Sequence, residues 1–265
     1  MVESDRLESG YPGKPGSWVR IPPSPKKEFV DYKDIQAGNT SNHFWFKAKC
    51  DLVATLLERV SAGKTGLRIL SLGAGTGDDL EILNRYGLVY VVDIDQRALA
   101  LINENSCVEK RCQDACALSY EDNFFDIVVA CDVFEHIQDD HRALAQVHRV
   151  LKQGGVLIFT VPAHQWLFSA HDRALGHYRR YSKKTLKTLL NPFSIRTISY
   201  WNSLLFVPAA CKRLSERWSK PKVNSVVLPT LLNSFCYRLL SIDNLLIKKH
   251  IMLPTGLSLV GICRK

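Results

Sequence analysis

Three glycines lie close together in the segment Leu70-Ser71-Leu72-Gly73-Ala74-Gly75-Thr76-Gly77-Asp78-Asp79. An apolar run that predicts a buried strand precedes this turn, and a helical pattern follows it. Open α/β sheets bind ligands at such turns, outside the carboxyl ends of the strands. Glycine allows a ligand to approach the backbone closely because it carries no side chain. We therefore predict that Gly73, Ala74, Gly75 and Gly77 line a binding site.

Asp93 ends the next predicted strand, 20 residues after Gly73. A carboxylate there can accept hydrogen bonds from ribose hydroxyls, which predicts an adenosine-type ligand. A dinucleotide-binding turn would place its third glycine one residue later, and here Asp78 and Asp79 stand at the start of the helix. Two carboxylates would repel a diphosphate but suit a ligand with an ammonium and a sulfonium. S-adenosylmethionine is therefore the predicted cofactor, and a nicotinamide dinucleotide is the alternative.

Short apolar runs alternate with helical patterns after a first amphipathic helix. The runs are continuously apolar, which is typical of parallel strands covered on both faces. The predicted fold class is α/β, with an open, mostly parallel, doubly wound (Rossmann-like) sheet and a helical insertion before the last strand. The predicted strands are 67–72, 88–94, 108–112, 125–131, 156–161, 195–201 and 257–263, and the predicted helices are 43–60, 78–86, 96–105, 139–151 and 182–190.

The domain organisation predicted is a tail followed by a single domain over residues 29–265. Residues 1–28 are rich in proline and glycine and lack apolar periodicity, which indicates a disordered tail. No apolar run reaches the 18 or so residues that a membrane span needs. The predicted parts of the domain are a core (43–161), a lid (162–181), a basic helical insertion (202–250) and a last strand (257–263).

The stretch from about Leu67 to Val161 resembles the class I S-adenosylmethionine-dependent methyltransferases. The resemblance is carried by the glycine turn, Asp93, Phe125-Asp126-Ile127-Val128-Val129, Glu135-His136-Ile137 and Arg149-Val150-Leu151-Lys152-Gln153-Gly154-Gly155. It implies that the glycine turn holds the methionine part of the cofactor, that Asp93 binds the ribose and that Ile94 lies against adenine. It also implies that Asp114, followed by Ala115, contacts the adenine edge. Cys131 is predicted to belong to the same site.

Members of that family vary widely at the positions of Cys131 and Asp132, so the resemblance does not identify the methyl acceptor. Methyl transfer requires alignment of the acceptor and exclusion of water, and an oxygen acceptor can also need its proton removed. Histidine is the usual base near neutral pH. The candidate catalytic residues are His136, His171 and His177.

The basic, aromatic loop 162–181 is predicted to bind the acceptor, because loops at this edge of a sheet carry function more often than the elements they join. The alternative is a solvated basic loop whose aromatic rings cover the core. No metal site is predicted, since the spacing of His164, His171, Asp172 and His177 matches no known site. The candidate acceptor-binding residues are His164, Trp166, Tyr178, Arg179 and Arg180.

The net charge of +9 lies in the last part of the chain. Residues 1–195 hold 24 Lys and Arg against 24 Asp and Glu, whereas residues 196–265 hold 11 against two. Apolar positions recur at helical spacing within 202–250, and a basic amphipathic helix can lie in a membrane interface. Contact of this segment with a membrane is one hypothesis, and packing on the sheet or a dimer face is the other. No nucleic-acid partner is predicted.

The function predicted from these observations is S-adenosylmethionine-dependent methylation, at oxygen, of a small-molecule, glycan or lipid-linked acceptor. A nicotinamide-dependent oxidoreductase is one alternative, and a non-catalytic peripheral membrane or scaffold protein with a vestigial cofactor pocket is another. The N-terminus lacks the features of a secretory signal, and eight scattered cysteines are predicted to be reduced. The predicted location is cytoplasmic, with contact at the inner face of the membrane as a further hypothesis.

Overall fold

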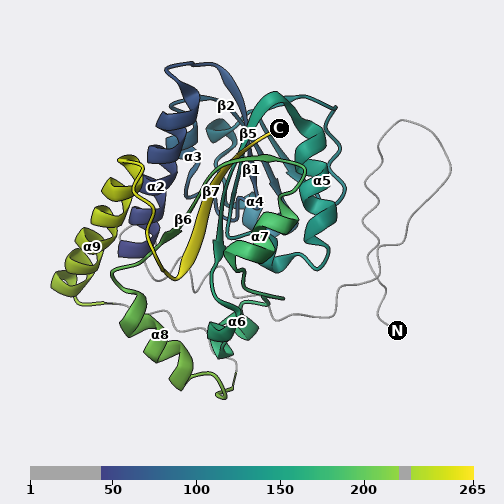
Figure 1. The fold of residues 1–265 in the computed structure, drawn as a ribbon. Helices are drawn as coiled ribbons and strands as arrows, with labels where there is room; N and C mark the ends of the chain where they lie inside the picture. The colour runs from purple at the N-terminus through teal and green to yellow at the C-terminus, as the bar shows by residue number, and fades with distance from the viewer. Residues whose placement is uncertain (1–42, 221–227) are drawn as a thin grey trace, which may run out of the picture.

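The computed structural model describes residues 43–220 and 228–265, which form one seven-stranded sheet in the order β3-β2-β1-β4-β5-β7-β6 (Figure 1). Neighbouring strands are parallel except at β7, which runs antiparallel to both β5 and β6. The predicted open, mostly parallel α/β sheet is therefore confirmed, while the predicted tail at 1–28 lies outside the described residues. The strands are β1 (Leu67–Leu72), β2 (Gly87–Asp93), β3 (Glu109–Cys112), β4 (Phe125–Cys131), β5 (Leu151–Pro162), β6 (Ser194–Trp201) and β7 (Ser258–Arg264).

Helices cover both faces of the sheet, as Figure 1 shows. Successive side chains of a strand point to opposite faces, so Leu70 and Leu72 of β1 pack with α5 and α7, while Ile69 packs with α2, α3 and α9. Burial on both faces explains why the strand sequences are continuously apolar. The helices are α2 (Phe44–Ser61), α3 (Leu80–Leu83), α4 (Gln96–Ala100), α5 (Asp140–Val150), α6 (Ala170–Ala174), α7 (Lys183–Leu189), α8 (Phe206–Ser215) and α9 (Thr230–Lys248).

Two helices next to the glycine turn are shorter than predicted. The segment predicted as helix 78–86 contains α3 and then tight turns, in which the Arg85 and Tyr86 amides donate to carbonyls three residues earlier. The segment predicted as 96–105 contains α4 and a separate short 3₁₀ turn over Glu104–Ser106, because the Asn103 side chain accepts a hydrogen bond from the Asn105 amide and caps a new turn.

The helical insertion lies between β6 and β7, as predicted, and α9 runs beside α2 in Figure 1. Hydrogen bonds join the two helices: the Tyr237 hydroxyl donates to Asp51 Oδ2 at 2.7 Å, and Asn244 Nδ2 donates to the Ala48 carbonyl at 2.9 Å. One face of α9 is therefore part of the core, which agrees with the hypothesis that the insertion packs on the domain. No helix of the described ranges is long and apolar enough to cross a membrane.

The packing of α9 predicts that substitutions on its buried face lower the stability of the protein more than substitutions on its exposed face. Leu240 is 0% exposed against α2 and the sheet, whereas Leu231 is 87% exposed. We expect Leu240→Ala to lower the free energy of unfolding by about 2–5 kcal/mol, because it leaves a cavity, and Leu231→Ala to change it by less than about 0.5 kcal/mol. Urea denaturation followed by circular dichroism measures both, and equal effects would contradict the packing.

Candidate active site

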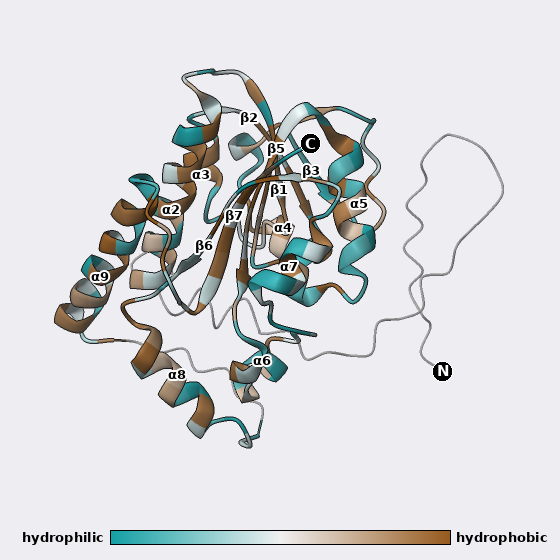
Figure 2. Cartoon of the chain, in the orientation of Figure 1, coloured by the Kyte–Doolittle hydropathy of each residue, from teal (hydrophilic) through white to brown (hydrophobic). Residues whose placement is uncertain are grey.

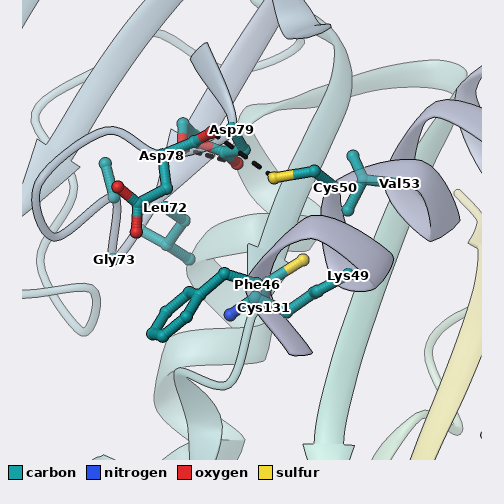
Figure 3. A pocket seen from close by; sticks show the side chains of 11 residues that line it. Phe46, Lys49, Cys50, Val53, Leu72, Gly73, Asp78, Asp79 and Cys131 are labelled. Atoms are coloured by element: carbon teal, nitrogen blue, oxygen red, sulfur yellow. Dashed lines mark hydrogen bonds between the residues drawn. The ribbon is translucent and has the colours of Figure 1, made fainter. Parts of the chain in front are cut away.

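A pocket opens at the carboxyl end of β1, where the glycine turn leads into α3 and the beginning of α2 passes over it (Figure 3). It holds about 480 Å³ of empty space when the solvent at its open side is included. Cys50 Sγ donates to the Asp78 carbonyl at 3.4 Å and so ties α2 to the turn. The lining residues are Phe46, Lys49, Cys50, Val53, Ser71, Leu72, Gly73, Ala74, Asp78, Asp79 and Cys131.

The glycine turn adopts a backbone that other residues rarely tolerate. Gly73, Gly75 and Gly77 have φ angles of +67°, +55° and +81°, in the left-handed region that favours glycine. A Cβ on Gly73 would lie 2.5 Å from Val133 Cγ2, and one on Gly77 would lie 2.8 Å from Leu80 Cδ1. The backbone conformation therefore favours glycine at all three positions. Of the predicted residues, Gly73 and Ala74 line the pocket, whereas Gly75 and Gly77 are not among its lining residues.

Asp93 lies beside the turn at the end of β2. Its Oδ2 atom accepts a hydrogen bond from the Gly75 amide at 2.8 Å, and its Oδ1 atom accepts one from the Asp95 amide at 2.8 Å. These bonds hold the carboxylate at the edge of the sheet where ribose binding was predicted. Each oxygen retains a further lone pair, so contact with a ligand stays a prediction.

The predicted adenine-contacting residues follow the neighbouring strand ends. Ile94, next to Asp93, is 67% exposed. Cys112, the last residue of β3, pairs with Asp93 in the sheet register, so Asp114 and Ala115 come just beyond the same edge. The Asp114 carboxylate accepts a hydrogen bond from the Cys116 amide at 2.8 Å, which shapes this loop. The structure thus brings these residues to one edge with the glycine turn, and their contact with adenine remains a prediction.

Opposite charges line the pocket and come from different elements (Figure 3). Burial raises the pKa of Asp79, at the start of α3, to about 6, even though Lys49 and the Ser71 hydroxyl favour its charged form. Lys49 of α2 places its Nζ atom 3.3 Å from Asp132 Oδ2. Burial would lower the pKa of Lys49, but Asp132 and other nearby acidic groups keep it above its usual value. The site therefore combines an ammonium with a carboxylate.

Cys131 and Asp132 continue from β4 into this site. Asp132 has a φ angle of +57°, which is uncommon for a residue other than glycine. Two bonds to Thr160 of β5 hold it there: the Asp132 amide donates to the Thr160 carbonyl at 2.9 Å, and the Thr160 hydroxyl donates to Asp132 Oδ1 at 3.0 Å. Cys131 lines the pocket, so its contact with a cofactor stays a prediction, and burial raises the pKa of its thiol.

A second group of side chains, which we call the Glu-His-His cluster, consists of Glu135, His136 and His177. The rings of His136 and His177 meet edge to face with 4.6 Å between their centroids. Glu135 is 1% exposed, and burial, then the nearby Asp132, raises its pKa well above the usual value. The structure therefore joins two of the three predicted catalytic histidines, together with a carboxylate that was noted only as part of a family pattern.

Asp172 orients the His177 ring. Its Oδ1 atom lies 3.0 Å from His177 Nδ1, and Arg180 donates to Oδ1 at 2.8 Å and to Oδ2 at 3.1 Å. Burial alone would raise the pKa of Asp172, but His177, Arg180 and the Ser169 amide hold it well below its usual value. Arg180 is itself buried in this network, which argues against its predicted contact with the acceptor. Its position supports a role in holding the lid.

The remaining lid residues lie in other surroundings. The His164 ring stacks on Tyr200, with centroids 5.1 Å apart, and Trp166 and Phe206 lie near it. Arg179 pairs with Asp140 at 2.9 Å, and Tyr178 is exposed. Burial, then the nearby Arg213, lowers the pKa of His171 to about 3, so we expect its ring to be neutral at pH 7. Leu167, Ser169 and Tyr181 are buried, whereas Trp166 and Tyr178 are exposed, so the loop is partly packed on the domain and both interpretations of it stay open.

Residues missed by the sequence analysis come mainly from α2. Phe46 and Lys49 line the pocket, although the sequence pattern indicates only an amphipathic helix that packs on the core. Lys49 stands out as a cation between apolar positions, and only the packing of α2 over the glycine turn shows that it reaches the site. For Asp79, the sequence pattern indicates only a carboxylate at the start of a helix that would repel a diphosphate, whereas in the structure it lines the pocket.

Comparison with known proteins identifies a domain family for the central part of the chain. Residues 70–159 match a family model described as a methyltransferase domain. A ubiquinone/menaquinone biosynthesis C-methyltransferase of Shewanella frigidimarina is 30% identical over 130 residues, which cover 43% of this chain and 51% of that protein. Phosphoethanolamine N-methyltransferase 2 of Caenorhabditis elegans is 28% identical over 114 residues, or 40% of this chain and 26% of that protein. The chain thus spans about half or less of the length of these curated relatives.

The fold is also that of a solved methyltransferase. A SAM-dependent methyltransferase from Archaeoglobus fulgidus has a TM-score of 0.52 and 19% sequence identity, over 82% of this chain and 94% of that one. The strand order, the glycine turn and the family match agree with one another. Residues 70–159 therefore contain a methyltransferase domain, and the fold around it is Rossmann-like.

Proposed function

We propose that this protein transfers a methyl group from S-adenosylmethionine to a hydroxyl oxygen of a lipid-linked or glycan acceptor. The cofactor would occupy the pocket between α2 and the glycine turn, with its sugar beside Asp93. When bound, it supplies a methyl group on a positively charged sulfur. The protein then has to align the acceptor with that carbon, exclude water and accept or release the hydroxyl proton.

The observation that carries the proposal is the pair of opposite charges in the pocket. The methionyl end of the cofactor bears an ammonium and a carboxylate, and Asp79 and Lys49 offer a partner of the opposite sign to each. Lys49 already pairs with Asp132, but an ammonium has three donors. A nicotinamide dinucleotide fits less well, since its diphosphate would meet Asp78 and Asp79. This comparison disfavours the oxidoreductase alternative.

The Glu-His-His cluster is proposed to hold the acceptor oxygen and to ease the loss of its proton. The nearby Asp132 affects the pKa of Glu135, and Asp132 also pairs with Lys49 of the cofactor pocket, so the cluster neighbours that pocket. Asp172 fixes the orientation of the His177 ring. Tyr178 and Arg179 lie at the surface of the same loop, where they can contact a bulky acceptor.

The raised pKa of Asp79 predicts how cofactor affinity depends on pH. Binding of an ammonium favours ionised Asp79, so affinity should be full above the free-state pKa of about 6 and fall as the pH drops below it. The fall can reach about tenfold per pH unit. Calorimetric titration with S-adenosylmethionine from pH 5 to 7 measures this dependence.

Asp79→Asn should weaken binding at pH 7 by about 10- to 100-fold, since one charge-assisted hydrogen bond is lost, and should flatten the pH dependence. Methylthioadenosine, which lacks the amino-acid part, is the matched ligand control: its affinity should be the same for both proteins. No heat from the parent protein with S-adenosylmethionine, or tight binding of NADH in its place, would reject the proposed function.

Loss of the His177 imidazole should impair catalysis without affecting the cofactor. We expect His177→Gln to lower the rate of methyl transfer by about 100-fold or more, with the dissociation constant for S-adenosylmethionine unchanged. The measurement follows deuterated methyl incorporation into a bacterial lipid extract by mass spectrometry. His141→Ala, which removes an exposed imidazole from α5, is the control and should retain full activity.

We also propose that α8 and the beginning of α9 contact an anionic membrane surface. Apolar side chains on and just after these helices face solvent, among them Val207 of α8 (68% exposed), Trp218 after α8 (89%) and Leu231 of α9. Figure 2 shows the apolar positions along both helices. The other exposed apolar residues of this surface, which we call the α8–α9 surface, are Leu204, Leu214, Leu232 and Phe235.

The charges around the α8–α9 surface support a lipid partner. Lys212, Arg217 and Lys220 are exposed beside its apolar side chains, and each cation near an anionic bilayer contributes about 1 kcal/mol. In Figure 1, α8 lies at the same end of the molecule as α6 of the lid. A bilayer on this surface would therefore present a lipid-linked hydroxyl at the carboxyl edge of the sheet, where the cofactor pocket opens.

Co-sedimentation with vesicles tests the membrane contact. We expect the protein to bind phosphatidylglycerol vesicles more tightly than phosphatidylcholine vesicles, with binding weakened by salt. The double variant Trp218→Ser, Leu231→Ser should bind at least about tenfold more weakly, since burying one apolar side chain is worth about 1.5–3 kcal/mol. Val108→Ser, at an exposed site before β3, is the control. Dimer formation without vesicle binding would contradict the proposal.

A further inference from the structure

Glu135 presents an unusual polar atom in the interior. Its side chain is 1% exposed, and its Oε2 atom is buried without a hydrogen-bond partner among the described residues. Leaving a buried carboxylate oxygen unpaired is unfavourable, because the group loses its water and gains nothing in exchange. Such an atom in a folded protein therefore points to a ligand that satisfies it.

The neighbours of that oxygen are metal-ligand types. One ligand atom each from Glu135, His136 and His177 lie within 4.8 Å of one another. Three atoms so spaced leave a point within about 2.8 Å of all of them, and zinc bonds to nitrogen and oxygen are about 2.0–2.2 Å long. Small side-chain rotations would therefore bring the three atoms to bonding distance. Two imidazoles and one carboxylate fill three positions of a tetrahedral site, so the fourth position stays open for another ligand.

The surroundings of His177 resemble those of metal-bound histidines in proteins. Such a histidine almost always donates its other ring N–H to a carboxylate or carbonyl, which fixes the tautomer and makes the ligand more basic. His177 Nδ1 lies 3.0 Å from Asp172 Oδ1, and this directs Nε2 away from Asp172. Asp172 is held in turn by two bonds from Arg180 and one from the Ser169 amide. The ring is thus oriented before any ion arrives.

We propose that Glu135, His136 and His177 bind one divalent transition-metal ion of the zinc class beside the cofactor pocket. This inference rests on the proposed function, because it assigns the acceptor site to an ion with an open coordination position. A hydroxyl oxygen bound there would release its proton to a water molecule more readily, since a divalent cation lowers the pKa of a bound oxygen ligand, and the oxygen would then attack the methyl carbon as the bond from that carbon to the cofactor sulfur breaks. The structure thus assigns to the cluster a Lewis-acid role in place of that of a free imidazole base.

Titration of the metal-stripped full-length protein with Zn²⁺, against a chromophoric chelator, tests the site. We expect one tight equivalent for the parent protein and at least about 100-fold weaker binding for Glu135→Gln and for His177→Ala. Asp172→Asn should weaken it by about 10- to 100-fold. His141→Ala is the matched control and should bind like the parent. Co²⁺ should give a visible absorption band that the same variants lose.

Measurements of cofactor binding distinguish a misfolded variant from a loss of the metal site. The S-adenosylmethionine affinity of each variant, measured in the absence of metal, should equal that of the parent, which shows that the variant is folded. No tight Zn²⁺ equivalent in the parent, or one that survives both Glu135→Gln and His177→Ala, would overturn the metal site. If the parent bound no metal yet transferred methyl groups, the proposed function would stand and the metal inference would fail.

Discussion

The site depends on one constraint, that the chain must turn tightly at the end of β1 through backbone conformations that favour glycine. Three glycines at alternate positions, Gly73, Gly75 and Gly77, adopt left-handed conformations that allow this turn, and the hydrogen bond from the Gly75 amide to Asp93 joins it to the end of β2. Two strand ends that are distant in sequence thereby form one rigid edge. The beginning of α2, β4 and the lid all pack around that edge, so their chemistry is positioned by the turn.

Charged groups lie buried around this edge, and each is compensated. Burying a lone charge is strongly unfavourable, so buried charges persist where partners surround them. Lys49 has Asp132, and Asp172 has His177 and Arg180. Asp79 and Glu135 are compensated less completely, as their raised pKa values indicate. Asp79 lines the cofactor pocket and Glu135 belongs to the Glu-His-His cluster, so a ligand at either position could supply a missing partner.

Motifs at the ends of strands could be predicted from the sequence, whereas contacts between side chains of distant segments could not. The glycine turn and Asp93 could be found because their roles follow from the ends of adjacent strands, and the parallel sheet follows from its apolar runs. Lys49 could not be placed, since a cation on an amphipathic helix gives no sign of which loop lies beneath it. The convergence of His136 with His177 depends on how the lid folds back over the sheet. Arg180 could not be assigned from sequence because its partner, Asp172, is defined by that folding.

The position of β7 has a consequence for how the chain reaches this state. In the described residues β6 joins the sheet solely through β7, which lies between it and β5. During synthesis, β6 emerges from the ribosome before its pairing partner exists, and the whole helical insertion must follow before β7 arrives. The first five strands can assemble earlier from near neighbours. The sheet can therefore be completed only after β7 has been synthesised. Pairing between strands that are distant in sequence slows folding. Until then the edge of β5 is unpaired, and such edges are prone to aggregation and are bound by chaperones.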